Sequence, residues 1–218
     1  MSTRPITVTL SAAFGAGGGV VGPKLAERLG LPFHNRAIPA TVSAELGVEL
    51  ESVLPHDGRT ETGLARLLTA AARVPSATLG GAEAYLIDPR QVDEKIVADQ
   101  TASIVRAIAD GDGGVILGRA AAVVLAGHPR ALHVRLDGPV ESRIRQAAGL
   151  TGLTEQAAKE TQARVDKARE AYVKKLYGKD PRDSRLYHVM LDSTTITWET
   201  CVDILFLAAD EWHRAEKD

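Results

Sequence analysis

The chain opens with a short segment in which apolar and polar residues alternate, Ile6-Thr7-Val8-Thr9-Leu10. β-Branched residues in such alternation predict a β-strand. A glycine cluster follows at 15–19, and from 20 to 29 apolar or small residues recur at helical spacing. Gly30 stands where a glycine commonly ends a helix. The first 30 residues therefore predict a strand, a glycine loop and a helix.

Strands and helices also alternate in the second half of the chain. Glycine-bounded or β-branched apolar runs predict strands there, and apolar residues at helical spacing predict helices. Pro139 suits the first turn of a helix, and Thr154 and Thr197 are suitable N-caps. We expect strands at 113–118, 131–136 and 186–191, and helices at 120–125, from 139, at 154–177 and at 197–209.

Residues 36–110 read differently, as a mostly helical insertion that prolines at 39, 55, 75 and 89 divide into short pieces. Strands that alternate with helices predict an α/β fold, with a parallel sheet of about five strands and helices on both faces. Ligands of such sheets bind at the carboxyl ends of the strands. That rim should hold the glycine loop, Gly118-Arg119 and Asp137.

Composition narrows the class of protein. The chain has 218 residues, of which 44% are apolar and 25% charged, as expected for one globular domain spanning 1–218. A formal net charge of -2 argues against nucleic acid as a partner. Residues 5–24 hold five glycines and three hydroxyls, so we expect neither a membrane span nor a signal peptide. A single cysteine, Cys201, fits a cytoplasmic protein, and the six histidines show no metal-ligand spacing.

A glycine loop between a strand and a helix is suited to phosphate. Glycines let backbone amides approach the anion, and the helix offers its positive end. The usual Lys-Ser/Thr pair of a phosphate-binding loop is missing, and the first lysine, Lys24, stands about two turns into the helix. Two alternatives stay open: a tight turn without a ligand, and a dinucleotide site that Gly15-x-Gly17-x-Gly19 matches loosely.

Five blocks, in order, carry a resemblance to a known family. They are Thr9-Leu10-Ser11-Ala12-Ala13-Phe14-Gly15-Ala16-Gly17-Gly18 with 25–30, Val115-Ile116-Leu117-Gly118-Arg119, 136–143, Arg164-Val165-Asp166-Lys167-Ala168-Arg169 with 170–172, and Leu191-Asp192-Ser193-Thr194-Thr195. Together they resemble the cytidylate kinase-like family, in the nucleoside monophosphate kinase branch of P-loop proteins. The resemblance covers nearly the whole chain.

The resemblance implies a P-loop kinase fold in which 36–110 binds the acceptor and about 150–182 forms a small helical lid. It implies ATP and Mg²⁺ as cofactors, and a nucleotide and a small-molecule acceptor as partners. A homodimer stays open. The cofactor-binding residues that it implies are Gly15, Ala16, Gly17, Gly18, Gly19 and Arg143, and the catalytic residues are Arg119, Arg164, Asp166 and Arg169.

Helical geometry limits what the expected lid can do. Arg164 and Arg169 are five residues apart, about 140° in projection, so only one of them faces the site well. Asp166 and Arg169 are three apart and can pair. A lid arginine of the usual kinases falls at Gln162 here.

The departures from the family pattern replace charged residues by small neutral ones. Gly18 stands where typical nucleotide kinases have the loop lysine, and Gly19 where this family often has a basic residue. Ala12-Ala13 replaces an Arg-Glu pair, and Ala120 an acidic residue. Two hypotheses follow: an ATP-dependent kinase of a CMP-like nucleoside monophosphate or another small acceptor, and a catalytically impaired nucleotide-binding or scaffold protein.

Overall fold

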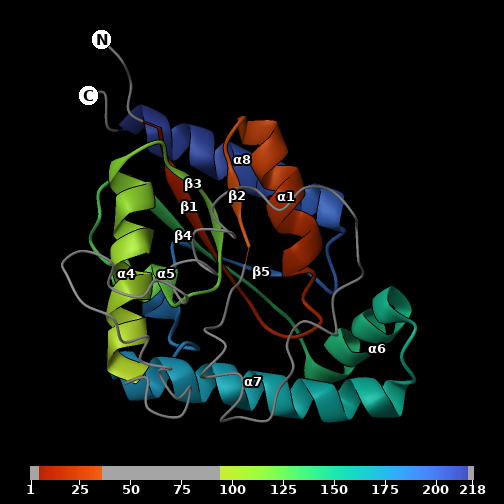
Figure 1. Ribbon diagram of the computed structural model, residues 1–218. Helices are drawn as coiled ribbons and strands as arrows, with labels where there is room; N and C mark the ends of the chain where they lie inside the picture. The colour runs from red at the N-terminus through yellow and green to blue at the C-terminus, as the bar shows by residue number, and fades with distance from the viewer. Residues whose placement is uncertain (1–4, 36–93, 216–218) are drawn as a thin grey trace, which may run out of the picture.

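A computed structural model describes residues 5–35 and 94–215 of the chain (Figure 1). Five strands form one parallel sheet in the order β2-β3-β1-β4-β5. The strands are β1 (Thr7–Ala12), β2 (Phe33–His34), β3 (Gly114–Leu117), β4 (Ala131–Asp137) and β5 (Val189–Asp192). The helices are α1 (Gly18–Leu29), α4 (Glu94–Asp110), α5 (Ala121–Val124), α6 (Val140–Thr151), α7 (Glu155–Tyr177) and α8 (Trp198–Ala215), with a 3₁₀ turn, η3 (Ser184–Leu186).

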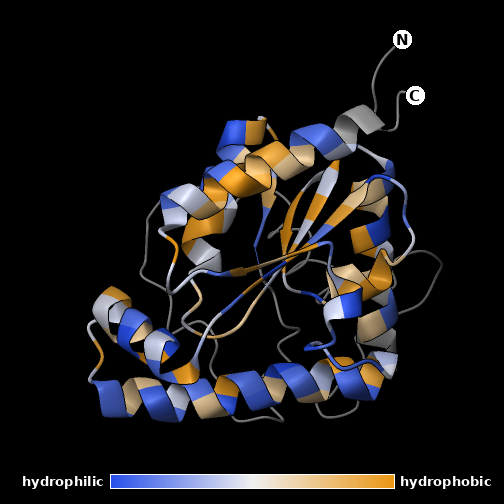
Figure 2. Cartoon of the chain, turned by 180° about the vertical axis from the view of Figure 1, so that it is seen from behind, coloured by the Kyte–Doolittle hydropathy of each residue, from blue (hydrophilic) through white to orange (hydrophobic). Residues whose placement is uncertain are grey.

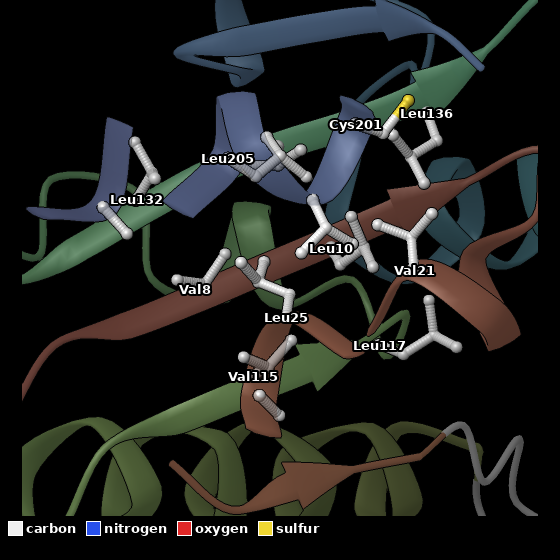
Figure 3. Close-up of a cluster of buried hydrophobic side chains, with 14 of the residues drawn as sticks. Val8, Leu10, Val21, Leu25, Val115, Leu117, Leu132, Leu136, Cys201 and Leu205 are labelled. Atoms are coloured by element: carbon white, nitrogen blue, oxygen red, sulfur yellow. The ribbon is translucent and has the colours of Figure 1, made fainter. Parts of the chain in front are cut away.

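Alternate residues of the central strands point to opposite faces of the sheet. On one face, apolar side chains of β1, β3 and β4 pack against α1 and α8 (Figure 3). This core includes Val8, Leu10, Val115, Leu117, Leu132 and Leu136 from the strands, and Val21, Leu25, Cys201 and Leu205 from the helices. The opposite face packs Ile116 and Ala131 against α4 and α5. The prediction of helices on both faces is therefore confirmed.

The second face also carries buried polar side chains. Thr7, Thr9, His133 and Arg135 are all buried, and they occupy alternate positions of β1 and β4. Thr9 lies opposite His133 in the sheet register, and the Thr9 hydroxyl is 2.8 Å from His133 Nδ1. One face of the central strands is therefore apolar, and the other is partly polar toward the carboxyl ends.

Several local predictions are confirmed. Gly30 ends α1 with a φ of 65°, and the hydroxyls of Thr154 and Thr197 accept from the amides of Ala157 and Thr200, each at 3.2 Å. The prediction of one strand over 186–191 is wrong at its start, because the chain first makes the 3₁₀ turn η3. Pro139 is the N-cap of α6 rather than part of its first turn.

The helix α7 crosses the molecule at the side where the strands end (Figure 1). It packs against α6 through a small cluster that includes Phe14, Ile144 and Val165. Figure 2 shows many hydrophilic residues along α7, in contrast to the strands. The expected lid is thus dominated by one helix of 23 residues. Of the expected insertion, α4 is helical, and 36–93 lie outside the described residues.

None of the described helices is both long enough and apolar enough to cross a membrane.

Candidate functional site

A cavity of about 370 Å³ lies between the carboxyl ends of β1, β3 and β4 and one face of α7. Its wall carries five arginines, Arg119, Arg135, Arg143, Arg169 and Arg182, and three carboxylates, Asp137, Asp166 and Glu170. The remaining wall includes small residues of β1 and of the turn after β3, together with Tyr172 and Tyr187. Cations outnumber anions, so the cavity is suited to an anionic ligand.

The sheet contributes the polar side of this cavity. Thr9 and Ser11 of β1 and Arg135 and Asp137 of β4 are alternate strand residues that line it. Arg135 donates to Asp137 Oδ2 from Nε at 2.9 Å and from Nη2 at 2.6 Å. Burial opposes the charge of Arg135, but its attraction to Asp137 outweighs burial and raises the pKa of the guanidinium. The charges of Arg135 and Asp137 therefore compensate each other, and their hydrogen bonds hold both side chains in place on the polar side of the cavity.

Arg119 enters the cavity from the turn between β3 and α5. Arg119 and Ala120 both have left-handed backbone conformations, with φ of 56° and 51°. Non-glycine residues rarely adopt such conformations, which cluster at functional sites. The Arg119 guanidinium donates to the carbonyl oxygen of Asn35, 3.0 Å from Nη2. Burial lowers the pKa of Arg119, so an anion in the cavity would stabilise its charge.

Asp166 of α7 collects several donors around its carboxylate. The backbone amide of Phe14 donates to Oδ1 at 2.8 Å. Arg143 Nη1 and Gln162 Nε2 donate to Oδ2, each at 2.8 Å. Burial pushes the pKa of Asp166 upward, but these hydrogen bonds and the Arg143 charge outweigh burial and lower it. Asp166 is therefore ionised and joins α7 to α6 and to the residue before the glycine loop.

Arg169 is a buried cation of the cavity whose charge is only partly compensated. Its Nη1 donates to the carbonyl oxygen of Ala12 at 3.0 Å and lies 3.9 Å from Asp166 Oδ1. Its Nε is buried without a hydrogen-bond partner among the described residues. Burial, together with the nearby charges of Arg143 and Arg135, lowers the pKa of Arg169 to about 10. Phosphate oxygens are suitable acceptors for such a guanidinium.

The structure brings together four of the residues predicted from the sequence. Arg119, Arg143, Asp166 and Arg169 all line the cavity. Arg164 is exposed and is not among the lining residues. The difference between Arg164 and Arg169 is the one that their helical spacing predicts, since α7 is continuous through both positions.

The glycine loop lies beside this cavity without lining it. Gly15 and Gly17 have left-handed φ of 79° and 72°, and Ala16, Gly17 and Gly18 are buried. A Cβ on Gly15 would collide with the carbonyl of Arg143, and one on Gly17 with the indole of Trp198. Neighbouring side chains thus pack closely on the loop. The assignment of residues 15–19 to cofactor phosphates stays a prediction.

The carbonyl groups of Phe14 and of the glycine loop accept hydrogen bonds from side chains of α6 and of the turn after β5. Arg143 Nη1 donates to Phe14 O at 2.8 Å, and Gln146 Nε2 donates to Gly15 O at 2.8 Å. The Ser193 hydroxyl donates to Ala16 O at 2.8 Å. Arg143, expected to bind the cofactor, therefore supports the loop directly.

The residues at hand do not fit a protein-bound Mg²⁺. The position of the usual Ser/Thr ligand is Gly19, which has no ligand atom in its side chain. Within 5–35 and 94–215 there is no group of three His, Cys, Asp or Glu side chains that could hold a metal ion.

The sequence alone did not single out Arg135, Tyr172 or Tyr187 as site residues, although all three line the cavity. A signal was present for Arg135, a charged residue inside the apolar run 131–136. Arg135 stands two residues from both His133 and Asp137, and alternate strand residues point to the same face, so the three share one face of β4. No comparable pattern marks the two tyrosines.

The parallel five-stranded sheet, the glycine loop after β1 and the arginine-lined rim define a P-loop kinase type of fold. The model of the cytidylate kinase-like family matches residues 7–195, and the chain belongs to this family. The expected fold class and family are thereby confirmed.

A crystal structure of an uncharacterized protein from Eubacterium ventriosum is 18% identical, with a TM-score of 0.64, and the match covers 94% of this chain and 98% of that one. This likeness shows the fold. A gluconokinase structure from Sinorhizobium meliloti is 14% identical, with a TM-score of 0.49 and coverage of 99% and 98%.

One curated protein, a uronate isomerase from Corynebacterium glutamicum, is 33% identical over 113 residues. The match covers 52% of this chain and 21% of that protein, so the chain spans about a fifth of the length of this relative.

Proposed function

We propose that this chain binds the phosphate group of a small molecule, such as a CMP-like nucleoside monophosphate, in the arginine-lined cavity, and that ATP is the phosphoryl donor. One observation carries the proposal: Arg169 presents a buried Nε without a partner among the described residues, on the wall of a cavity with an excess of cations. A phosphate oxygen would supply the missing acceptor.

The arrangement of cations supports phosphoryl transfer chemistry. Such transfer depends mainly on positioning and on charge neutralisation. Arg119 reaches the cavity from the sheet rim and Arg169 from α7, so the two can bind oxygens of one phosphate from different sides. Asp166 orients Arg143 through a direct ion pair, and α7 forms one wall of the cavity. ATP, when bound, would supply the phosphoryl group.

A second candidate function is nucleotide binding without turnover. It is favoured by the replacement of the loop lysine by Gly18. A preorganised cation or donor at the reacting phosphate contributes about 3 kcal/mol of transition-state stabilisation. The described lining of the cavity includes no lysine, and Arg143, the lining cation that contacts the start of the loop, is already bound to Asp166 and to Phe14 O.

The test begins with calorimetric titration of nucleoside monophosphates, and of a hexuronate in view of the relative named uronate isomerase. We expect Arg169→Ala to weaken binding of the best ligand by at least about tenfold, since hydrogen bonds to charged groups contribute about 1.5–3 kcal/mol. Arg164→Ala, on the exposed face of the same helix, is the matched control and should leave the affinity unchanged.

Thermal melts of both variants, and a parallel Arg169→Lys variant that keeps the charge, separate lost binding from lost folding. Absence of binding by the wild type for every phosphate ligand would overturn the proposal. So would equal affinities of the two alanine variants. Release of ADP from ATP with the tightest acceptor then decides between transfer and binding alone.

A further inference from the structure

The Asp166 carboxylate is bound in the manner of a ligand anion. It accepts from a backbone amide of the turn after β1, from a buried arginine and from an amide side chain, each at 2.8 Å. Backbone amides at such turns and guanidinium groups are the donors with which proteins hold phosphate. The donors around Asp166 therefore form an anion site, and the chain itself supplies the anion.

The two ends of this contact come from distant parts of the chain. The Phe14 amide belongs to the residue immediately before Gly15, whereas Asp166 lies near the middle of α7. A second link between the same elements runs from Arg169 to the carbonyl of Ala12. The Asp166 contact is thus one of the bonds that hold α7 closed over the end of β1.

The donors around Asp166 are buried and already engaged. They therefore cannot hold a second anion beside the Asp166 carboxylate. The Arg143 side chain is 6% exposed and the Asp166 side chain 18%. Arg143 Nη1 is divided between Asp166 and Phe14 O, and its Nε donates to Gly138 O at 2.9 Å. A phosphate placed against these donors would meet the Asp166 charge at close range, and like charges so placed repel strongly.

We propose that the Phe14 amide and Arg143 form an anion site in which Asp166 is an internal competitor, so that a phosphate ligand at these two donors must displace this carboxylate. The inference rests on the proposed function and adds to it how the cavity is regulated: a ligand that reaches these donors loosens the contact between Asp166 of α7 and the residue before the glycine loop. Inorganic pyrophosphate is the simplest ligand with the required chemistry.

The test compares Asp166→Asn with Glu160→Gln in the full chain. Asp166→Asn removes the negative charge but keeps an acceptor for the Phe14 amide, and Glu160→Gln removes one charge from the exposed face of α7. We expect Asp166→Asn to bind pyrophosphate at least about tenfold more tightly than the wild type, and Glu160→Gln less than about twofold, the size of a screened surface effect.

Equal pyrophosphate affinities of wild type, Asp166→Asn and Glu160→Gln would overturn the inference while leaving the proposed function intact. If none of the three proteins binds pyrophosphate, and the wild type binds no other phosphate ligand, the inference and the proposed function are both overturned. Hydrogen exchange of the wild type gives an independent readout if Asp166→Asn does not fold. Pyrophosphate should then speed exchange around residues 162–170, and slower exchange there would contradict displacement.

Discussion

The Nζ atom of Lys24 lies 2.7 Å from Oε1 of Glu199, which directs the first lysine after the glycine loop toward α8. Both side chains are largely exposed, at 48% and 69%, so this pair contributes little to stability. Its importance is that Lys24 does not stand in for the missing loop lysine.

We therefore predict that Lys24→Ala leaves the affinity for pyrophosphate unchanged within about twofold and the free energy of unfolding within about 0.5 kcal/mol. Titration calorimetry and urea unfolding measure the two quantities. A tenfold loss of affinity would show that Lys24 reaches the ligand after all.

Gly17 and Gly30 offer a matched test of how tightly the loop is packed. Both have left-handed φ, of 72° and 65°, and alanine in that conformation costs about 1–2 kcal/mol. A Cβ on Gly17 would also strike the Trp198 indole, whereas a Cβ on Gly30 would meet no described atom within 4 Å beyond the adjoining residues of the chain. Gly17→Ala should therefore lower the free energy of unfolding clearly more than Gly30→Ala in urea titrations. Equal losses would mean that the indole moves aside freely.

Arg143 and Arg145 lie on the same helix in opposite environments. Arg143 is buried against Asp166 and the Phe14 carbonyl, and Arg145 is exposed, with a hydrogen bond to the Ser142 hydroxyl. Arg143→Met leaves the partly buried Asp166 carboxylate without its cation, and such a loss costs up to about 3–5 kcal/mol when the pair is fully buried. Arg145→Met should cost less than about 0.5 kcal/mol. Chemical unfolding of both variants measures the difference, and similar values would refute the structural role of Arg143.

His133 predicts a pH dependence of stability. Its ring stacks on His188, with ring centres 4.8 Å apart, and His188 stacks on Trp212. Burial, followed by the charge of a protonated His188, lowers the pKa of His133 to about 4. The folded state therefore favours the neutral ring. This contribution is complete above the unfolded pKa of about 6.5 and is lost as the pH falls toward 4.

Between about pH 7.5 and about pH 5.5 we expect this group to remove about 1 kcal/mol of unfolding free energy. Urea unfolding at both pH values measures the change. His133→Gln should show a smaller pH dependence than the wild type, and an identical dependence would assign the effect to other groups.

The fold was predictable because its signals are local. Gly30 marks a helix end, Thr154 a helix start, and the alternation from Ile6 to Leu10 a strand, and each of these depends on residues close in the sequence. The start of β5 was missed although its signal is also local, because the 3₁₀ turn at Ser184–Leu186 begins at Asp183, whose side chain accepts from the Arg185 amide.

The site was predictable only in part, because its members meet through tertiary contacts. Helical spacing separated Arg169 from Arg164 correctly. No spacing rule links Phe14 to Asp166, which are 152 residues apart in the chain, or places Tyr187 over Ser11. Such contacts arise from how α7 and the segment before β5 pack on the sheet.

The apolar face and the polar face of β1 and β4 have separate roles, because one forms the core and the other lines the cavity. Thr9, Ser11, Arg135 and Asp137 line the cavity, so substitutions among them should alter its ligand choice, while Leu10, Leu132 and Leu136 hold α1 and α8 in place. A library randomised at the first group and fixed at the second should therefore yield soluble proteins with altered ligand choice.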